Sequence, residues 1–184
     1  MSKKVLVPIS DGSEELEAIT VVNLMRRAGF EVVIAGDSEV ITGARNSRII
    51  VDDLIENIND INDFDLIVLP GGLKGVNSFS KNEKLKNLVK NHIAAQKYTG
   101  AICAAPLALK SYEVLEPTKI LTSFPAVKDE LIEYKYMDDK VVTDDKLVTS
   151  RGVGTAIDFA LELIELLESR SLADKIAEEI VYTR

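Results

Sequence analysis

The sequence predicts an α/β fold in which a mostly parallel central sheet carries helices on both faces. Short apolar runs of strand length alternate along the chain with longer segments of helical periodicity. This alternation is typical of parallel strands joined by crossover helices. The 184 residues contain no repeat, low-complexity tract or flexible linker, so we expect a single domain over residues 1–184.

The first half of the chain is predicted to open with a strand, a helix and a second strand. Apolar residues fill Lys3–Ile9, Ser13 can cap a helix that runs to Ala28, and Gly29 suits the helix end. The elements expected next are a strand over Glu31–Ala35, a short antiparallel pair of Val40–Thr42 with Arg48–Val51, a buried strand over Asp65–Leu69 and a helix over Asn82–Lys97.

The second half is predicted to repeat this alternation. The expected elements are a very short strand over Gly100–Ile102, a helix over Ala105–Tyr112, a strand over Lys119–Thr122, a hairpin of Val141–Val142 with Leu147–Ser150 around Asp144–Asp145, a helix over Thr155–Glu168 and a last helix from Ser171. The carboxyl ends of parallel strands meet at one edge of a sheet, where binding sites form. Four segments follow such ends: the turn after Ile9, Pro70–Gly72, Cys103 and Arg151–Gly154.

Charge and cysteine content narrow the class of function. The net charge is −8, which disfavours nucleic acid and anionic lipid as partners. One cysteine allows no internal disulfide, which suits a reducing compartment, and we expect the protein to be cytoplasmic. The N-terminal apolar stretch is too short for a signal peptide or a membrane span.

Cys103 is the strongest candidate for chemistry. Small residues flank it in Gly100–Ala105, as a sharp strand-to-helix turn requires, and this pattern is typical of a nucleophile elbow with Cys in place of Ser. Pro106 suits the first turn of the following helix. The positive end of that helix is expected to lower the pKa of the thiol. The alternative is a small buried apolar side chain.

Two acidic residues fall on the apolar face of the first predicted helix. At 100° per residue, Glu14 and Glu17 continue the stripe of Ala18, Val21 and Leu24 at its N-terminal end. A carboxyl buried there should have a raised pKa and could donate a hydrogen bond or exchange a proton near neutral pH. The alternative is that one or both only occupy the helix start.

The remaining motifs are weaker. Pro70–Gly72 can aim backbone amides at an oxyanion or be a simple tight turn. Arg151–Thr155 can cradle an anion but lacks a nucleotide-binding spacing. His92, the single histidine, is expected to be exposed or half-buried, so no Cys-His dyad is predicted. We expect no metal site and no cofactor.

Four motifs together resemble the ThiJ/PfpI superfamily, and most of all its branch of the parkinsonism-associated protein (DJ-one) type. They occur in the order of that family and span nearly the whole chain: Ser13–Glu17, Leu69–Gly72, Ala101–Pro106 and Thr149–Thr155. The resemblance implies a flavodoxin-like three-layer sandwich and a homodimer.

The resemblance also assigns roles to residues. It implies that Cys103 is the reactive thiolate, that Glu17 is a protonated glutamate bonded to the sulfur, and that Gly72 and Ala104 supply oxyanion amides. Further residues match positions around the cysteine, the pocket or the dimer interface of relatives: Glu14, Gly71, Arg48, Arg27, Ser150 and Gly154.

Two departures bear on activity. Ala104 stands where protease-like relatives carry histidine, which argues against peptidase activity. Phe124 stands where animal members have a histidine near the pocket, so a proton transfer by that histidine is not available and slow turnover is expected.

Two functions follow from the resemblance. The first is an enzyme acting on reactive 2-oxoaldehydes, of the glutathione-independent glyoxalase or protein deglycase type, through a hemithioacetal on Cys103. The second is a non-enzymatic peroxide sensor or redox-regulated chaperone, in which Cys103 becomes a sulfinate. A nucleotide- or flavin-binding protein rests on fold analogy alone.

Overall fold

In the computed structural model, which describes residues 2–183, a seven-stranded sheet has the strand order β10-β11-β7-β6-β1-β2-β5. Neighbouring strands run parallel, except that β10 pairs antiparallel with β11. The bounds of these strands are β1 Lys4–Ile9, β2 Glu31–Gly36, β5 Asp53–Leu54, β6 Leu66–Leu69, β7 Tyr98–Ile102, β10 Val141–Asp144 and β11 Leu147–Ser150. The predicted mostly parallel sheet is confirmed.

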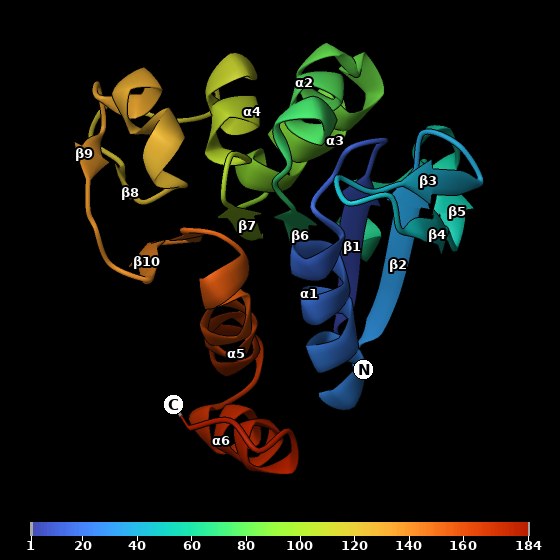
Figure 1. Ribbon diagram of the computed structural model, residues 1–184, viewed down its shortest axis with the longest axis vertical. Coiled ribbons are helices and arrows are strands. Elements are labelled where there is room, and N and C mark those ends of the chain that lie inside the picture. The colour runs from blue at the N-terminus through green and yellow to red at the C-terminus, as the bar shows by residue number, and fades with distance from the viewer. Residues whose placement is uncertain (1, 184) are drawn as a thin grey trace.

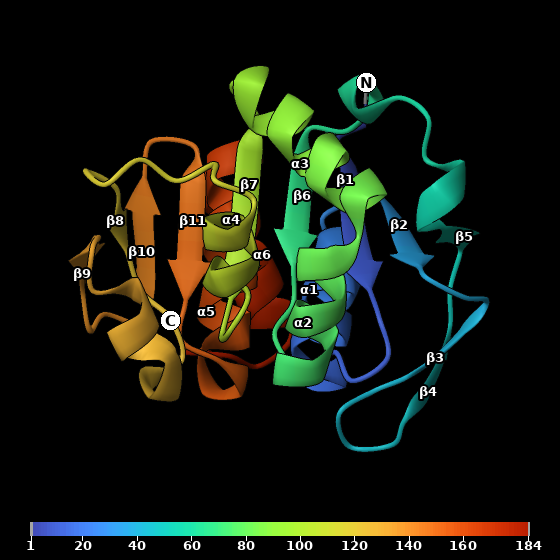
Figure 2. The ribbon, with the colours of Figure 1, turned by 90° about the horizontal axis from the view of Figure 1, so that it is seen from above.

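Helices cover both faces of the sheet, which gives three layers (Figure 1). One face carries α1 Glu15–Arg27 and α5 Ala156–Leu167, with α6 Arg170–Glu179 packed on α5; the other carries α2 Leu73–Lys81, α3 Glu83–Ala94 and α4 Pro106–Ser111 (Figure 2). Successive side chains of β7 enter the two cores in turn: Ala101 packs with the α2–α4 layer and Ile102 with the α1 and α5 layer. None of the helices within residues 2–183 has the length and apolar character needed to cross a membrane.

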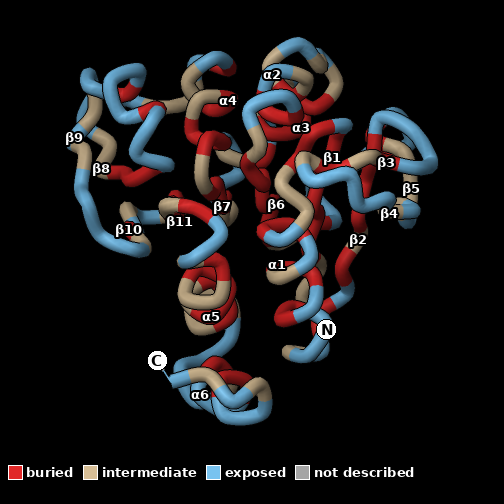
Figure 3. Tube along the Cα trace, in the orientation of Figure 1, coloured by how far each residue is buried: buried red, intermediate tan, exposed pale blue. Residues whose placement is uncertain are grey.

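Buried residues follow this layering (Figure 3). The central strands β1 and β6 are buried almost throughout, because helices cover them on both sides. On α1 the predicted apolar stripe is buried at Ala18, Val21 and Leu24. The stripe faces the sheet and α5, and Glu17 is buried with it.

Small elements extend from the sheet. β3 Val40–Thr42 and β4 Arg48–Ile50 form the predicted antiparallel pair, and β8 Ile120–Leu121 pairs with β9 Lys135–Tyr136 in a separate two-stranded sheet. Four short 3-10 helices complete the described chain: η1 Ile55–Asn57, η2 Ile61–Asp63, η3 Pro125–Leu131 and η4 Val153–Thr155.

The structure corrects two predictions about helices and one about a side chain. Ser13 does not cap α1, because its hydroxyl instead accepts a hydrogen bond from the Ser10 N–H at 3.0 Å. The helix α2 was not predicted, since Gly75 and two serines weaken its helical signal. His92 is fully buried rather than exposed or half-buried, because it lies on the apolar face of α3 with Leu88 and Val89.

Candidate functional site

Cys103 occupies a strained turn between β7 and α4. Its φ is 63°, a left-handed conformation that a side chain with a Cβ rarely adopts. Hydrogen bonds hold the backbone of Cys103 at both its N–H and its carbonyl. The N–H donates to the Ser150 carbonyl, and the carbonyl accepts from the Phe124 N–H, each at 2.9 Å. Backbone strain that surrounding contacts maintain clusters at functional sites. The positive φ of Cys103 confirms the predicted sharp turn.

An open cavity of about 560 Å³ lies over the sulfur. We call it the Cys103 cavity. It is lined by Glu14, Glu17, Ala44, Arg45, Gly72, Leu73, Cys103, Ala104, Phe124, Pro125 and residues 151–155. The four segments that were predicted to meet at the carboxyl edge of the sheet therefore do so.

Glu17 reaches this site from the first turn of α1 and is fully buried. Its Oε2 accepts a hydrogen bond from the Gly71 N–H at 2.8 Å. Its Oε1 has no partner of hydrogen-bonding geometry among residues 2–183 and borders the same space beside Gly152 as the sulfur of Cys103. Burial raises the pKa of Glu17 to about 7, and the charge of Glu14 adds to this, while the Gly71 N–H and the nearby thiol act against it.

The thiol does not have the lowered pKa that the sequence suggested. Burial raises the pKa of Cys103 to about 12, and the negative charge of Glu17 contributes. The N–H groups of Gly72 and Ala104 donate to the sulfur and lower this pKa only in part. The helix α4 has six residues, and its positive end is too weak to outweigh burial and an acidic neighbour.

Two glycines allow the sulfur, the carboxyl and the amides to approach one another. A Cβ on Gly71 would lie 2.9 Å from the Cys103 Sγ and 2.7 Å from the Glu17 Oε2. Gly72 has a φ of 86°, which turns its N–H toward the sulfur, and a Cβ there would collide with the Gly12 carbonyl. Gly71 was expected to line the pocket. It instead lies behind the sulfur and does not line the cavity.

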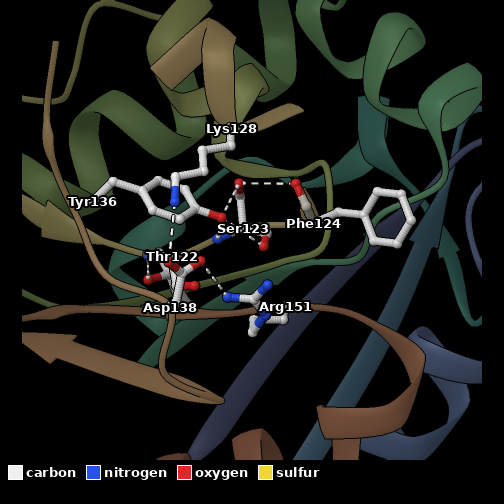
Figure 4. A network of polar contacts seen from close by, with 8 residues as sticks. Thr122, Ser123, Phe124, Lys128, Tyr136, Asp138 and Arg151 are labelled. Atoms are coloured by element: carbon white, nitrogen blue, oxygen red, sulfur yellow. Dashed lines mark hydrogen bonds and ion pairs between the residues drawn. The ribbon is translucent and has the colours of Figure 1, made fainter. Parts of the chain in front are cut away.

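A network of polar contacts surrounds the segment of Phe124, a cavity-lining residue that is 44% exposed (Figure 4). The Tyr136 hydroxyl donates to the Ser123 carbonyl at 3.0 Å. Asp138 accepts from Lys128 at 3.0 Å and from Arg151 at 2.9 Å, which ties the η3 segment to the turn after β11.

Three expected pocket residues lie elsewhere in this chain. Arg27 is exposed at the far end of α1, where its Nε donates to Asn23. Arg48 is exposed in β4, outside the cavity. Ser150 is fully buried, and its hydroxyl bonds Lys140 and Thr155 rather than facing the cavity.

Sequence reasoning missed four lining residues. Ala44 and Arg45 come from the β3–β4 turn, Leu73 from the start of α2, and Pro125 from the start of η3. Only the predicted strand pair around residues 43–47 hinted at the first two. Within residues 2–183, no three His, Cys, Asp or Glu side chains gather as metal ligands would.

The fold and site define an α/β protein with a cysteine at a nucleophile elbow, a buried carboxyl beside the sulfur and two amides aimed at it. Residues 3–166 match the DJ-1/PfpI family, and the chain belongs to this family. It is 37% identical to Protein dj-1beta of Drosophila melanogaster over 185 residues, covering 98% of each. It is 35% identical to a Caenorhabditis elegans protein named glutathione-independent glyoxalase DJR-1.2, covering 91% of this chain and 89% of that protein.

Solved structures agree with the flavodoxin-like sandwich. The crystal structure of Drosophila melanogaster DJ-1beta superposes with a TM-score of 0.95 over all of both chains. Toxoplasma gondii DJ-1, described as oxidized, gives a TM-score of 0.92 at 34% identity, again over all of both chains. Two relatives from Arabidopsis thaliana, DJ-1 homologs B and A, each 39% identical, are longer, and the matched part spans 38% and 44% of their lengths.

Proposed function

We propose that the protein converts reactive 2-oxoaldehydes to hydroxy acids without glutathione. The observation that carries this proposal is the buried Glu17 carboxyl, with a pKa raised to about 7, beside the Cys103 sulfur at the floor of an open cavity. A proton-transfer group works best when its pKa lies near the operating pH. The relative named as a glyoxalase supports the same chemistry.

The reaction begins with addition of the Cys103 sulfur to the aldehyde carbon. Because the pKa of the thiol is raised and that of Glu17 lies near 7, the Glu17 carboxylate takes the thiol proton as the carbon–sulfur bond forms. The product is a hemithioacetal. Its oxygen first carries negative charge within reach of the Gly72 and Ala104 N–H groups, which stabilise it. Glu17 then returns the proton to this oxygen and becomes a carboxylate again.

Glu17 then moves a proton between neighbouring carbons. The carbon attached to sulfur loses its hydrogen, an enediol forms, and reprotonation at the former keto carbon leaves a thioester on Cys103. Water hydrolyses the thioester, which releases the hydroxy acid and restores the thiol. The net change adds one water to the 2-oxoaldehyde, so methylglyoxal gives lactate with no external oxidant. Phe124, which lines the cavity, carries no proton-transfer group, so Glu17 carries these transfers alone and slow turnover is expected.

The test is lactate formation from methylglyoxal by the pure protein, with Cys103→Ser as the control. We expect lactate from the wild type and none above background from the variant, because the serine hydroxyl is a far weaker nucleophile. Equal rates for the two proteins contradict the proposal. Release of free amine from a methylglyoxal-treated peptide, measured in parallel, tests the deglycase form of the same chemistry.

A second candidate is peroxide sensing by Cys103, with a chaperone or regulatory output. The sulfur borders the open cavity, and the Gly72 and Ala104 amides could hold sulfinate oxygens. The Toxoplasma gondii relative described as oxidized supports it. Mass spectrometry after mild peroxide treatment should find two added oxygen atoms on Cys103; an unmodified cysteine contradicts sensing and leaves the enzyme proposal intact.

We further propose that the protein is a cytoplasmic homodimer. Exposed apolar side chains gather on α1 and the β3–β4 pair, including Leu16, Ile19 and Ile50 at 54%, 39% and 79% exposure. Arg27 and Arg48 lie on the same elements and would then border the interface. Light scattering should give twice the 20.2 kDa mass of the chain, and Ile19→Glu should lower it.

A further inference from the structure

Arg45 supplies a charge at the Cys103 cavity that the proposed chemistry does not use. From it we infer that the cavity selects 2-oxoaldehydes carrying a carboxylate at the end remote from the aldehyde, and that Arg45 is the specificity-determining residue. The inference rests on the proposed function for the reaction, but the anion-binding role of Arg45 can be tested without turnover.

The size of the cavity favours a substrate larger than methylglyoxal. Five heavy atoms occupy on the order of 150 Å³ if each takes about the volume of a water molecule in the liquid, about 30 Å³. The cavity holds about 560 Å³. A longer substrate fits with its aldehyde at the sulfur and its tail toward the opening.

The β3–β4 turn that carries Arg45 is fixed to the start of α1 (Figure 1). The Glu15 carboxylate accepts hydrogen bonds from the Arg45 N–H at 2.9 and 3.1 Å and from the Ser47 N–H at 3.3 Å. The Ala44 N–H also donates to the Ser13 carbonyl at 2.8 Å. Arg45 therefore stands on a turn that the protein holds in place at the cavity.

The charges around the cavity orient an anionic substrate. Glu14 lies close enough to Glu17 for its charge to act on that carboxyl, so the inner end is acidic and repels a carboxylate. Arg151 lines the cavity but is paired with Asp138. Among residues 2–183, no ion pair is formed by the Arg45 guanidinium, which leaves it available to a substrate carboxylate.

The first test compares Cys103 alkylation by 4-(iodoacetamido)butanoate and by its uncharged amide, 4-(iodoacetamido)butanamide, which differ in charge only at the end remote from the reacting carbon and little in shape. Both react with the same thiolate, so the thiolate fraction cancels in the ratio of their rates. Arg45→Gln should lower the ratio of the rate with the carboxylate to the rate with the amide about two- to fivefold, the range for an exposed charge pair. Added salt should lower the wild-type ratio and leave that of Arg45→Gln nearly constant.

Lys74→Gln is the matched control. It removes one positive charge from an exposed position at the start of α2, next to a lining residue but outside the cavity. Its ratio should equal that of the wild type. An Arg45→Gln ratio equal to the wild type, or an equal fall in Lys74→Gln, overturns the inference.

Glu15 tests the positioning of the turn. Glu15→Ala should lower the ratio although Arg45 is intact, and Glu15→Gln should restore part of it, because the amide oxygen still accepts a hydrogen bond. A ratio unchanged in Glu15→Ala removes Glu15 from the proposal.

Turnover then separates the two proposals. The wild type should prefer 4,5-dioxopentanoate to the uncharged 2-oxopentanal in kcat/KM, and Arg45→Gln should lose this preference while its rate with 2-oxopentanal changes little. No turnover of either aldehyde, together with a lowered alkylation ratio, contradicts the proposed function and supports the anion subsite. Turnover without any preference contradicts the subsite alone.

Discussion

Glu17 and His92 are both fully buried titratable side chains, yet they lie in different surroundings at opposite ends of β7. Glu17 lies beside the residue that follows the strand, whereas His92 lies against its first residue, with Nε2 2.8 Å from the Tyr98 carbonyl oxygen. Burial moves both pKa values toward the neutral form: that of Glu17 rises to about 7, and that of His92 falls to about 4.

The difference between the two ends shows that a shifted pKa alone does not define a site. Around Glu17 the shift coincides with a cysteine at positive φ, two amides aimed at its sulfur and an open cavity. His92 has a backbone carbonyl as its polar partner, and its Nδ1 has none among residues 2–183. We therefore interpret His92 as part of the packing of α3 and Glu17 as part of the chemistry.

The largest effect is expected where the packing at the sulfur is tightest. Gly71→Ala would place a Cβ within 3 Å of the Cys103 and Glu17 side chains, so it should cost more than about 100-fold in lactate formation and about 1–3 kcal/mol in stability. Gly154→Ala is the control in the same cavity, since its Cβ would meet nothing within 4 Å. We expect less than a threefold loss there. Activity assays and urea unfolding measure both, and equal effects of the two substitutions would show that tight packing behind the sulfur is not required.

Glu17→Gln should have the next largest effect. Loss of the proton-transfer group should lower kcat/KM for methylglyoxal at pH 7 about 100-fold, at the low end for general acid–base catalysis. The wild-type profile should rise with an apparent pKa near 7, and this limb should vanish in the variant.

Glu14→Gln is the control for that substitution. The charge of Glu14 raises the pKa of Glu17, so its removal should shift the rising limb to lower pH with less than a tenfold loss of rate. If Glu14→Gln loses as much activity as Glu17→Gln, the proton-transfer role does not belong to Glu17 alone.

The sequence predicted the sheet and the elbow well because both depend on local patterns. Apolar runs marked β1 and β6, and small residues around Cys103 marked the turn. The pKa of the thiol was predicted with the wrong sign, because burial by distant segments is not visible in a local pattern. Arg45 was missed for the same reason, since only the folded β3–β4 turn brings it to the cavity.

The two buried groups should also oppose each other in the pH dependence of stability. Between pH 4.5 and about 7 native Glu17 keeps a proton that the unfolded chain has released, so its contribution to stability falls as pH rises. Between about pH 4 and 6.5 native His92 lacks a proton that the unfolded chain holds, so its contribution rises with pH. In the wild type the two contributions nearly cancel over pH 4.5–6.5.

Removing either group should reveal the contribution of the other to the pH dependence of stability. This is the smallest effect of the three predictions. Relative to the wild type, the slope of unfolding free energy against pH between 5 and 6 should become more negative in His92→Leu and more positive in Glu17→Gln. Each change should approach about 1.4 kcal/mol per pH unit, the value for one proton. Urea unfolding at half-unit steps of pH measures the slopes, and the difference between variant and wild type cancels the background of surface carboxylates.

Because His92 lies outside the cavity, His92→Leu should keep the activity profile of the wild type even as its stability profile changes. A variant that changes both would show that the two ends of β7 are coupled rather than independent.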